Sequence, residues 1–338
     1  MSLQANPLLE VDGLTIEFAS ERGAWVSVVE NVSFRVGRGE IVALVGESGS
    51  GKTVTSLALL GLLDARNGRV RGSIRFDGIE LAGLKGVAWR QIRGKRVGMI
   101  FQDPIEALNP AFTVGDQIAE TIRAHTGVNR RKAWTHAVDM LRRVRIPSPD
   151  RRAHYYPHML SGGMCQRVMI AQALACAPDL LIADEPTTAL DTTIQAAILQ
   201  LVREIQLETG ISVLLITHDL GVVAEIADRV IVMYAGQVVE SGSSADVLTS
   251  PVHPYTDALL GAIPNGSTRT LVTVPGAAPI PGQISVGCRF VSRCRHALPL
   301  CRNRDPDLQE LDKGRASRCL RVHELYALEA SRQGRATM

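Results

Sequence analysis

The chain has 338 residues, of which 46% are hydrophobic and 4% aromatic, and its formal net charge is +3. This length and composition allow one large α/β domain with an aliphatic core and a smaller second domain. No apolar run of about 18 residues and no apolar leader is visible, so the sequence predicts neither a membrane-spanning helix nor a signal peptide, and we expect a cytoplasmic protein.

The first predicted elements are alternating apolar and polar runs in residues 8–45, LEVDGLTIEF and WVSVVENVSFRV, followed by a turn and the buried strand IVALV. This alternation predicts a small antiparallel β layer. Its aromatic residues Phe18 and Trp25 could stack on an adenine ring. Core packing is an equal alternative for Phe18 and the favoured one for Trp25.

Residues 46–53, GESGSGKT, match the pattern G-x-x-x-x-G-K-[ST] of a phosphate-binding P-loop, with an apolar strand before it and the helical run VTSLALLGLL after it. The glycines let the backbone approach a polyphosphate, and the helix N-terminus points its N–H groups at the phosphates. Lys52 is predicted to reach the β- and γ-phosphates and Thr53 to ligate Mg²⁺. The predicted nucleotide contacts are Gly46, Glu47, Ser48, Gly49, Ser50, Gly51, Lys52, Thr53 and Thr55.

The next motifs lie around a helical stretch. The apolar run GMIFQ predicts a buried strand that ends in Gln102, whose side chain could touch Mg²⁺ or an attacking water. Residues 111–160 predict helices broken at 146–150, and LSGGM follows at 160–164. A Ser-Gly-Gly turn that opens a helix is a second potential phosphate site, although by itself it is a weak signal.

Two further apolar strands end in polar residues. LLIADEPTTALD (180–191) predicts a buried strand with Asp184 and Glu185 at its carboxyl end, where open α/β sheets bind ligands. Asp184 is predicted to hold Mg²⁺ and Glu185 to polarise the attacking water, with helix capping as the alternative. ISVLLITHD (211–219) predicts a strand ending in His218, which could contact a γ-phosphate. A strand–turn–strand (230–242) and a short helix (253–264) follow.

These motifs occur in the order and spacing of an ATP-binding-cassette (ABC) ATPase, which the chain resembles over about residues 8–260. The resemblance implies an α/β P-loop cassette in residues 1–260, with a mixed-sheet core, an antiparallel β subdomain and a helical insertion at about 111–175. It also implies that two such domains bind two ATP molecules head to tail. The roles it implies are catalysis by Glu185, His218 and Gln102, Mg²⁺ binding by Thr53, Gln102 and Asp184, adenine stacking by Phe18, and ATP contacts from Ser161, Gly162, Gly163 and Asp191.

Further features resemble the ABC importers of oligopeptides and dipeptides: FQDPIEALNP (101–110), HPYTDALL (253–260), and Met164 where most ABC signatures have Gln. The serine and glycines of the signature are intact, so we expect function to survive. This resemblance implies a peripheral ATPase on the cytoplasmic face of the inner membrane. Its implied partners are two transmembrane permease subunits, an extracytoplasmic substrate-binding protein and a second ABC ATPase, with a heterodimer preferred to a homodimer. The resemblance does not fix the cargo.

The C-terminal extension, residues 261–338, contains four cysteines with the spacing C-x5-C-x6-C-x17-C. In a cytoplasmic chain such thiols suit Zn²⁺ or a [4Fe–4S] cluster better than disulfides. No tight C-x2–4-C pair is present, which favours the cluster, as the resemblance does; zinc and no metal remain alternatives. The predicted ligands are Cys288, Cys294, Cys301 and Cys319, and the arginines expected to offset the cluster charge are Arg289, Arg293, Arg295 and Arg302.

From Cys288 to Met338 the chain has eleven Lys or Arg against six Asp or Glu, so a different function is also compatible with it. A soluble ABC ATPase could act on nucleic acid or ribosomes and use this basic tail as a binding module. The sequence has a single cassette, no coiled-coil insertion and no basic patch interleaved with aromatic residues, which argues against this alternative. We therefore expect no nucleic-acid partner.

Overall fold

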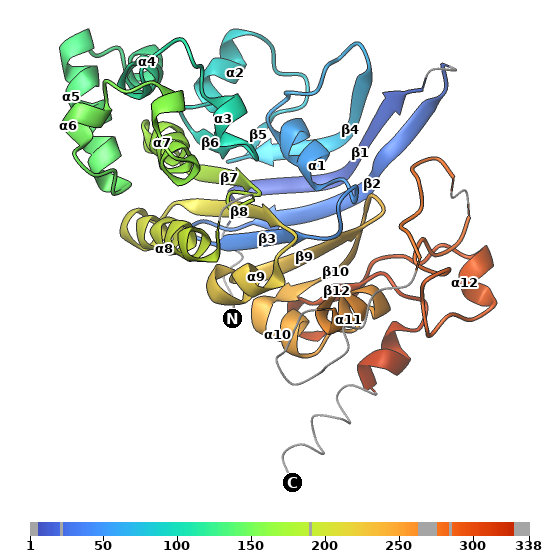
Figure 1. Cartoon of the computed structure of the whole chain (residues 1–338). Helices are drawn as coiled ribbons and strands as arrows, with labels where there is room; N and C mark the ends of the chain where they lie inside the picture. Colours follow the sequence, from blue (N-terminus) through green and yellow to red (C-terminus); the bar gives the residue numbers. More distant parts are fainter. Residues whose placement is uncertain (1–5, 21–22, 189–190, 263–275, 284–285, 328–338) are drawn as a thin grey trace. The chain divides into compact units, whose positions relative to one another are not determined.

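The structure is a computed structural model that describes residues 6–20, 23–188, 191–262, 276–283 and 286–327. The chain divides into two compact units. Unit 1 contains residues 1–8, 36–41 and 83–216, and unit 2 contains residues 9–35, 42–82 and 217–338. Figure 1 labels the helices and most of the strands of both.

Unit 1 has three parallel strands in the order β8-β7-β6: β6 (Val97–Ile100), β7 (Leu180–Asp184) and β8 (Ser212–Thr217). All residues of β7 and β8 are buried, which explains their uninterrupted apolar sequences. The predicted strand through Gln102 is shorter than expected, since β6 ends at Ile100 and both Phe101 and Gln102 are exposed. Ile100 pairs with Ala183, so Gln102 and Glu185 follow their strands at the same sheet edge.

Most helices of unit 1 begin at side-chain caps, and two of them end at glycines. The side chains of Thr113, Asn129 and Asp191 accept hydrogen bonds from backbone N–H groups in the first turn of their helices. Gly127 and Gly210 adopt left-handed conformations at two C-termini. The helices of unit 1 are α2 (Val87–Ile92), α3 (Pro104–Ala107), α4 (Val114–Thr126), α5 (Arg130–Arg143), α6 (Pro149–Arg152), α7 (Gly162–Leu174) and α8 (Thr192–Thr209), with a 3₁₀ turn at Pro157–Met159.

The predicted helical run at 111–160 is confirmed, but its break lies slightly earlier than expected. Helix α5 ends at Arg143 and α6 already starts at Pro149, inside the predicted break. Proline is tolerated at the first position of a helix because its missing N–H would be unpaired there in any case.

Unit 2 contains the predicted antiparallel layer, in the order β2-β1-β4-β5: β1 (Leu9–Ala19), β2 (Trp25–Val36), β4 (Gly68–Phe76) and β5 (Ile79–Glu80). Its other strands have the order β11-β12-β10-β9-β3: β3 (Ile41–Val45), β9 (Arg229–Tyr234), β10 (Gln237–Ser243), β11 (Gln309–Glu310) and β12 (Ala316–Ser317). The β3–β9 pair is parallel and the other pairs are antiparallel, so the predicted mixed sheet is confirmed. The helices are α1 (Lys52–Leu59), α9 (Leu220–Ile226), α10 (Ser244–Thr249), α11 (Pro254–Gly261) and α12 (Leu300–Asn303).

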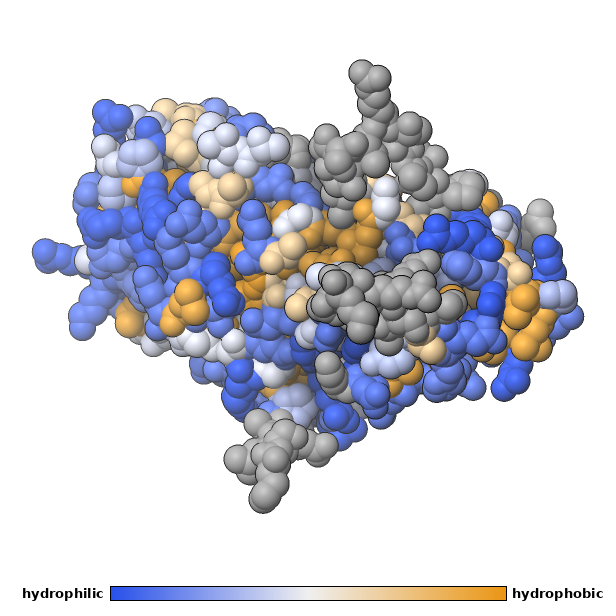
Figure 2. Space-filling model, turned by 90° about the horizontal axis from the view of Figure 1, so that it is seen from below, coloured by the Kyte–Doolittle hydropathy of each residue, from blue (hydrophilic) through white to orange (hydrophobic). Residues whose placement is uncertain are grey.

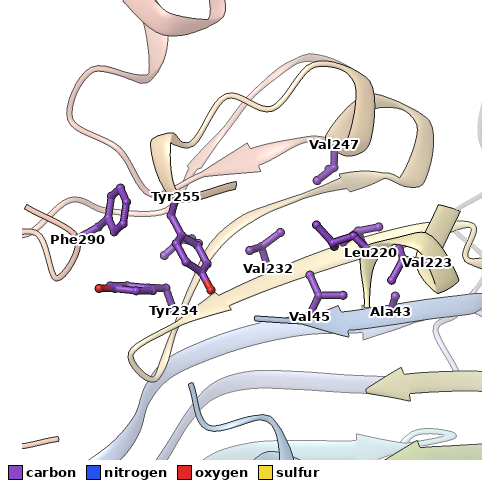
Figure 3. Packing of buried hydrophobic residues seen from close by; sticks show 11 residues of the cluster. Ala43, Val45, Leu220, Val223, Val232, Tyr234, Val247, Tyr255 and Phe290 are labelled. Atoms are coloured by element: carbon purple, nitrogen blue, oxygen red, sulfur yellow. The ribbon is translucent and has the colours of Figure 1, made fainter. Parts of the chain in front are cut away.

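The core of unit 2 includes an aromatic side chain from the cysteine-containing region, that of Phe290 (Figure 3). The ring of Phe290 lies edge-on to Tyr234 and Tyr255, with centroids 5.2 and 5.5 Å apart. All three side chains are buried. Residues 288–294 are therefore packed on the same core as the strand that leads into the P-loop, whose Ala43 and Val45 belong to the cluster. The predicted domain boundary at 260/261 stays a prediction, since residues 263–275 lie outside the described part.

No helix within the described ranges is long and apolar enough to cross a bilayer. The face seen in Figure 2 is mainly hydrophilic, with hydrophobic side chains in smaller groups.

Candidate active site

The P-loop of unit 2 is a tight turn that only glycine permits at its first position. Gly46 has φ +154°, and an added Cβ would lie 2.1 Å from the carbonyl oxygen of Met233. Gly51 is the left-handed N-cap of α1, so the N–H groups of the first turn of α1 point into the loop. The buried Lys52 donates from Nζ to the carbonyl oxygens of Gly46 (2.8 Å) and Glu47 (3.0 Å). The loop thus combines N–H donors with an ammonium group, as polyphosphate binding requires.

Two residues far away in the sequence, Tyr255 and Arg293, hold Glu47 of the loop, and the sequence did not predict either of them at this place. The backbone N–H of Glu47 donates to the hydroxyl of Tyr255 (2.9 Å). Both carboxylate oxygens of Glu47 accept from the guanidinium of Arg293, at 2.9 and 3.0 Å. Tyr255 belongs to the HPYT sequence, which was the available signal for it, whereas no local pattern identifies Arg293 as a neighbour of the P-loop.

Two other predicted loop contacts differ in their surroundings. The Oγ of Ser50 is buried without a hydrogen-bond partner among the described residues, so a bound group could satisfy it. The hydroxyl of Thr55 is fully buried and donates to the carbonyl oxygen of Gly51 (2.8 Å). This hydroxyl is engaged inside α1, and the predicted nucleotide contact of Thr55 stays a prediction.

In unit 1, the structure brings Gln102 and Glu185 together. Glu185 Oε2 accepts from Gln102 Nε2 (3.2 Å) and from the hydroxyl of Thr188 (2.8 Å), a contact that the sequence did not indicate. Glu185 has φ +46°, a left-handed conformation that costs a non-glycine residue of the order of 1–3 kcal/mol. Asp184, the last residue of β7, is 2% exposed. Two adjacent carboxylates with different surroundings suit the division into a metal ligand and a water-orienting base.

The other predicted site residues occupy helix starts and sheet edges. Ser161 caps α7 and Asp191 caps α8. A Cβ on Gly163 would lie 2.9 Å from Ile194, which explains the glycine there. His218 lies exposed between β8 and α9, in unit 2. Phe18 is half-buried at the end of β1 against Gly68.

The expectation that Trp25 packs in the core is wrong. Its side chain is 40% exposed, and the guanidinium of Arg69 lies 4.2 Å from its ring centroid. A cation–π contact of this kind holds a surface tryptophan without burying it.

All four cysteines of the C-terminal region line one small cavity, together with His253 and Phe290. Burial raises the pKa of the Cys288 and Cys319 thiols to about 11. Across the described ranges, no three His, Cys, Asp or Glu side chains are placed to hold a metal ion. This arrangement supports neither the zinc site nor the [4Fe–4S] cluster, and both stay predictions.

The expected charge compensation by arginines is wrong for Arg289 and Arg293, which pair with Glu30 and Glu47. Arg295 pairs with Asp257, but its charge also acts on the Cys294 thiol: burial raises the pKa of this thiol, and Arg295 opposes that rise. Arg321 is nearer to the thiols, since its backbone N–H donates to the Sγ of Cys319 (3.4 Å). The basic character of this region therefore serves mainly its attachment to carboxylates elsewhere in unit 2.

Comparison with known families agrees with this architecture. The model of the ABC transporter family matches residues 29–188, and the oligopeptide/dipeptide transporter C-terminal region matches residues 239–301. Among solved structures, the dimeric ATP-binding cassette MJ0796 bound to ADP and Pi is similar with a TM-score of 0.62 and 29% identity, over 70% of this chain and 98% of that one. The cbiO1 subunit from Clostridium perfringens is similar with a TM-score of 0.60 and 27% identity, over 72% and 91%.

The chain therefore belongs to the ABC transporter family of ATP-binding proteins, and it is an ABC ATPase. Within that family it carries the C-terminal region of oligopeptide and dipeptide transporters. A relative from Brucella abortus, described as a peptide import ATP-binding protein, is 50% identical over 94% of this chain and 96% of its own length. One from Sinorhizobium fredii, described as a peptide ABC transporter ATP-binding protein, is 47% identical over 97% and 100%. The alternative of a nucleic-acid ATPase finds no support.

Proposed function

We propose that this chain is the ATP-hydrolysing subunit of a membrane importer for dipeptides or oligopeptides. The observation that carries the proposal is the presence, on one chain, of an ABC cassette with an intact P-loop and of the C-terminal region of peptide transporters. The names of relatives that are about half identical over nearly the whole chain support the same cargo class.

The chemistry would be divided among the predicted residues as follows. The P-loop amides and Lys52 would bind the β- and γ-phosphates, and Ser161–Gly163 would contact the nucleotide of a second ATPase subunit. Mg²⁺, held by Thr53, Gln102 and Asp184, would neutralise developing charge on the phosphates. Glu185, oriented by Gln102 and Thr188, would orient the attacking water, and His218 would contact the γ-phosphate. The solved relative that is a dimer with ADP and Pi supports the pairing.

The proposed partners are two permease subunits, an extracytoplasmic substrate-binding protein and a second ATPase, preferably a different chain, at the cytoplasmic face of the inner membrane. Several apolar side chains in the segment around Gln102 support docking of a permease. Phe101, Ile105 and Phe112 are 40%, 65% and 52% exposed. Exposed apolar groups that gather in one segment are typical of protein interfaces.

We also propose that the cysteine cavity holds a [4Fe–4S] cluster. The lining of one cavity by four thiols from three segments supports it, as does the raised pKa of free thiols there, which bound iron would remove. Iron and acid-labile sulfide, measured on protein purified without oxygen, should both be near four per chain and fall when Cys294 is replaced by Ser. Protein free of iron and sulfide would contradict the cluster and leave the ATPase assignment intact.

The function is tested with a Glu185→Gln variant, since the amide keeps the size of the side chain and an acceptor for Thr188. We expect its ATPase rate to fall about 10²–10⁴-fold while ATP still binds. Cells lacking this chain should regain peptide uptake with the wild-type chain and not with the variant. Uptake restored by the variant, or ATP hydrolysis without any uptake of peptides, would contradict the proposal.

A further inference from the structure

The P-loop and the cysteine-containing region meet at Glu47, although they are far apart in the sequence. Glu47 is the second residue of GESGSGKT. The bidentate contact of Arg293 with the Glu47 carboxylate spans 246 residues, and the contact of Tyr255 with the Glu47 N–H spans 208. Both contacts lie within unit 2.

Arg293 is held so that its guanidinium cannot easily leave this position. Its side chain is 5% exposed, against 28% for that of Glu47. It also donates to the hydroxyl of Tyr234 (3.3 Å) and lies 6.0 Å from the Phe290 ring centroid. The Arg293 N–H donates to the carbonyl oxygen of Phe290 (3.0 Å), which closes a turn. A planar fork that is fixed in this way selects one orientation of the carboxylate it binds.

The contacts of Glu47 have two effects on the loop. The Tyr255 bond fixes the peptide group between Gly46 and Glu47, whose carbonyl oxygen accepts from Lys52 Nζ, and the Arg293 contact fixes the Glu47 side chain. They also neutralise a carboxylate placed in a loop whose ligand carries several negative charges, which would otherwise repel it. Neither effect needs Arg293 to touch the nucleotide.

We propose that Arg293 is a positioning residue for nucleotide binding, which acts through Glu47, with Tyr255 as its second support. The inference rests on the proposed function in that the P-loop must bind ATP. The C-terminal region thereby sets the affinity of the P-loop for ATP. The contact of Arg293 with Glu47 is present in the ATP-bound ground state and in the transition state alike. Its loss should therefore change the affinity for ATP and not the rate of hydrolysis.

The experiment measures binding of a fluorescent ATP analogue and steady-state ATPase kinetics in the full chain. We expect Arg293→Gln to raise the Kd and the KM about tenfold while kcat stays within twofold. Arg293→Lys should recover part of the affinity, because a single charged donor remains. The control Arg295→Gln removes a guanidinium two residues away that pairs with the half-exposed Asp257, and it should bind like the wild type.

A double variant separates positioning from a general loss of structure. If Arg293 acts through Glu47, Arg293→Gln should weaken binding no more than threefold when Glu47→Gln is already present. Should Arg293→Gln unfold the chain, Tyr255→Phe tests the same support by deleting one hydroxyl, and it should raise the Kd at least threefold. Wild-type affinity in both single variants, or equal effects of Arg293→Gln with and without Glu47→Gln, would overturn the proposal. A wild-type chain that binds no ATP would instead refute the proposed function.

Discussion

Replacing Arg315 by Met should destabilise unit 2 strongly, because this residue is half of a buried ion pair. Arg315 Nη2 lies 3.2 Å from Glu240 Oε1, and the side chains are 5% and 0% exposed. Arg315 Nη2 also donates to the carbonyl oxygen of Ser250 (2.6 Å). Glu240 is the residue of β10 that pairs with Ser317 of β12, so the ion pair fastens the C-terminal strand to the sheet.

The expected magnitude follows from what the substitution leaves behind. Removing one partner of a buried pair costs about 3–5 kcal/mol, since an uncompensated charge stays in the interior. The Glu240 carboxylate would keep the N–H donors of Val252 and His253, each at 2.9 Å, which offset part of that cost. We therefore expect a decrease of about 3 kcal/mol in the free energy of unfolding. Adding Glu240→Gln should reduce the total loss to about 1 kcal/mol, because the neutral amide can still accept one of these donors.

Urea denaturation followed by far-UV circular dichroism at pH 7 measures both values. Arg302→Met, at an exposed position of the same region, is the matched control and should change the free energy by less than 0.5 kcal/mol. A single variant within 1 kcal/mol of the wild type would refute the reasoning, as would a double variant less stable than the single one.

Three further outcomes are expected. Burial lowers the pKa of His253 to about 3, below the ~6.5 of the unfolded chain, so His253 contributes stability that is complete above pH 6.5 and lost as the pH falls towards 3. The free energy of unfolding, measured by urea denaturation at pH 7 and pH 5, should fall between these pH values by about 2 kcal/mol less in His253→Asn than in the wild type. An equal decrease in both proteins would contradict this. Gly46→Ala should weaken ATP binding at least tenfold, because its Cβ would meet the Met233 carbonyl oxygen at 2.1 Å; unchanged affinity in a nucleotide titration would contradict the required backbone. Thr188→Val should lower kcat about tenfold at constant ATP KM, through loss of the 2.8 Å bond to Glu185, and a changed KM alone would argue against that role.

The sequence was most informative where local chemistry decides the structure. The uninterrupted apolar runs that became β7 and β8, the capped helices and the glycine pattern of the P-loop are all readable within short windows. The positions of Gln102 and Glu185 after buried strands were also predicted, but the contact between their side chains was not. The C-terminal end of β6 was harder to predict, because Phe101 is apolar and yet exposed.

Contacts between distant segments could not be predicted in the same way. The arginines near the cysteines were assigned to the nearest charge in the sequence, but Arg289 and Arg293 reach Glu30 and Glu47 in the folded unit. Long side chains select partners by spatial proximity, which depends on how the strands are ordered. For the same reason the sequence did not predict the role of Tyr255, whose ring is buried and whose hydroxyl accepts a hydrogen bond from the Glu47 N–H.

The separation of Glu47 from Arg293 has a consequence for the newly made protein. Ribosomes add about 5–20 residues per second, so the 246 positions between these residues correspond to roughly 10–50 s of translation. During this interval the P-loop exists without its arginine support. A nascent chain should therefore acquire its full capacity to hold ATP only after residue 293 has left the exit tunnel, which would delay occupancy of the cassette until the peptide-transporter region is in place.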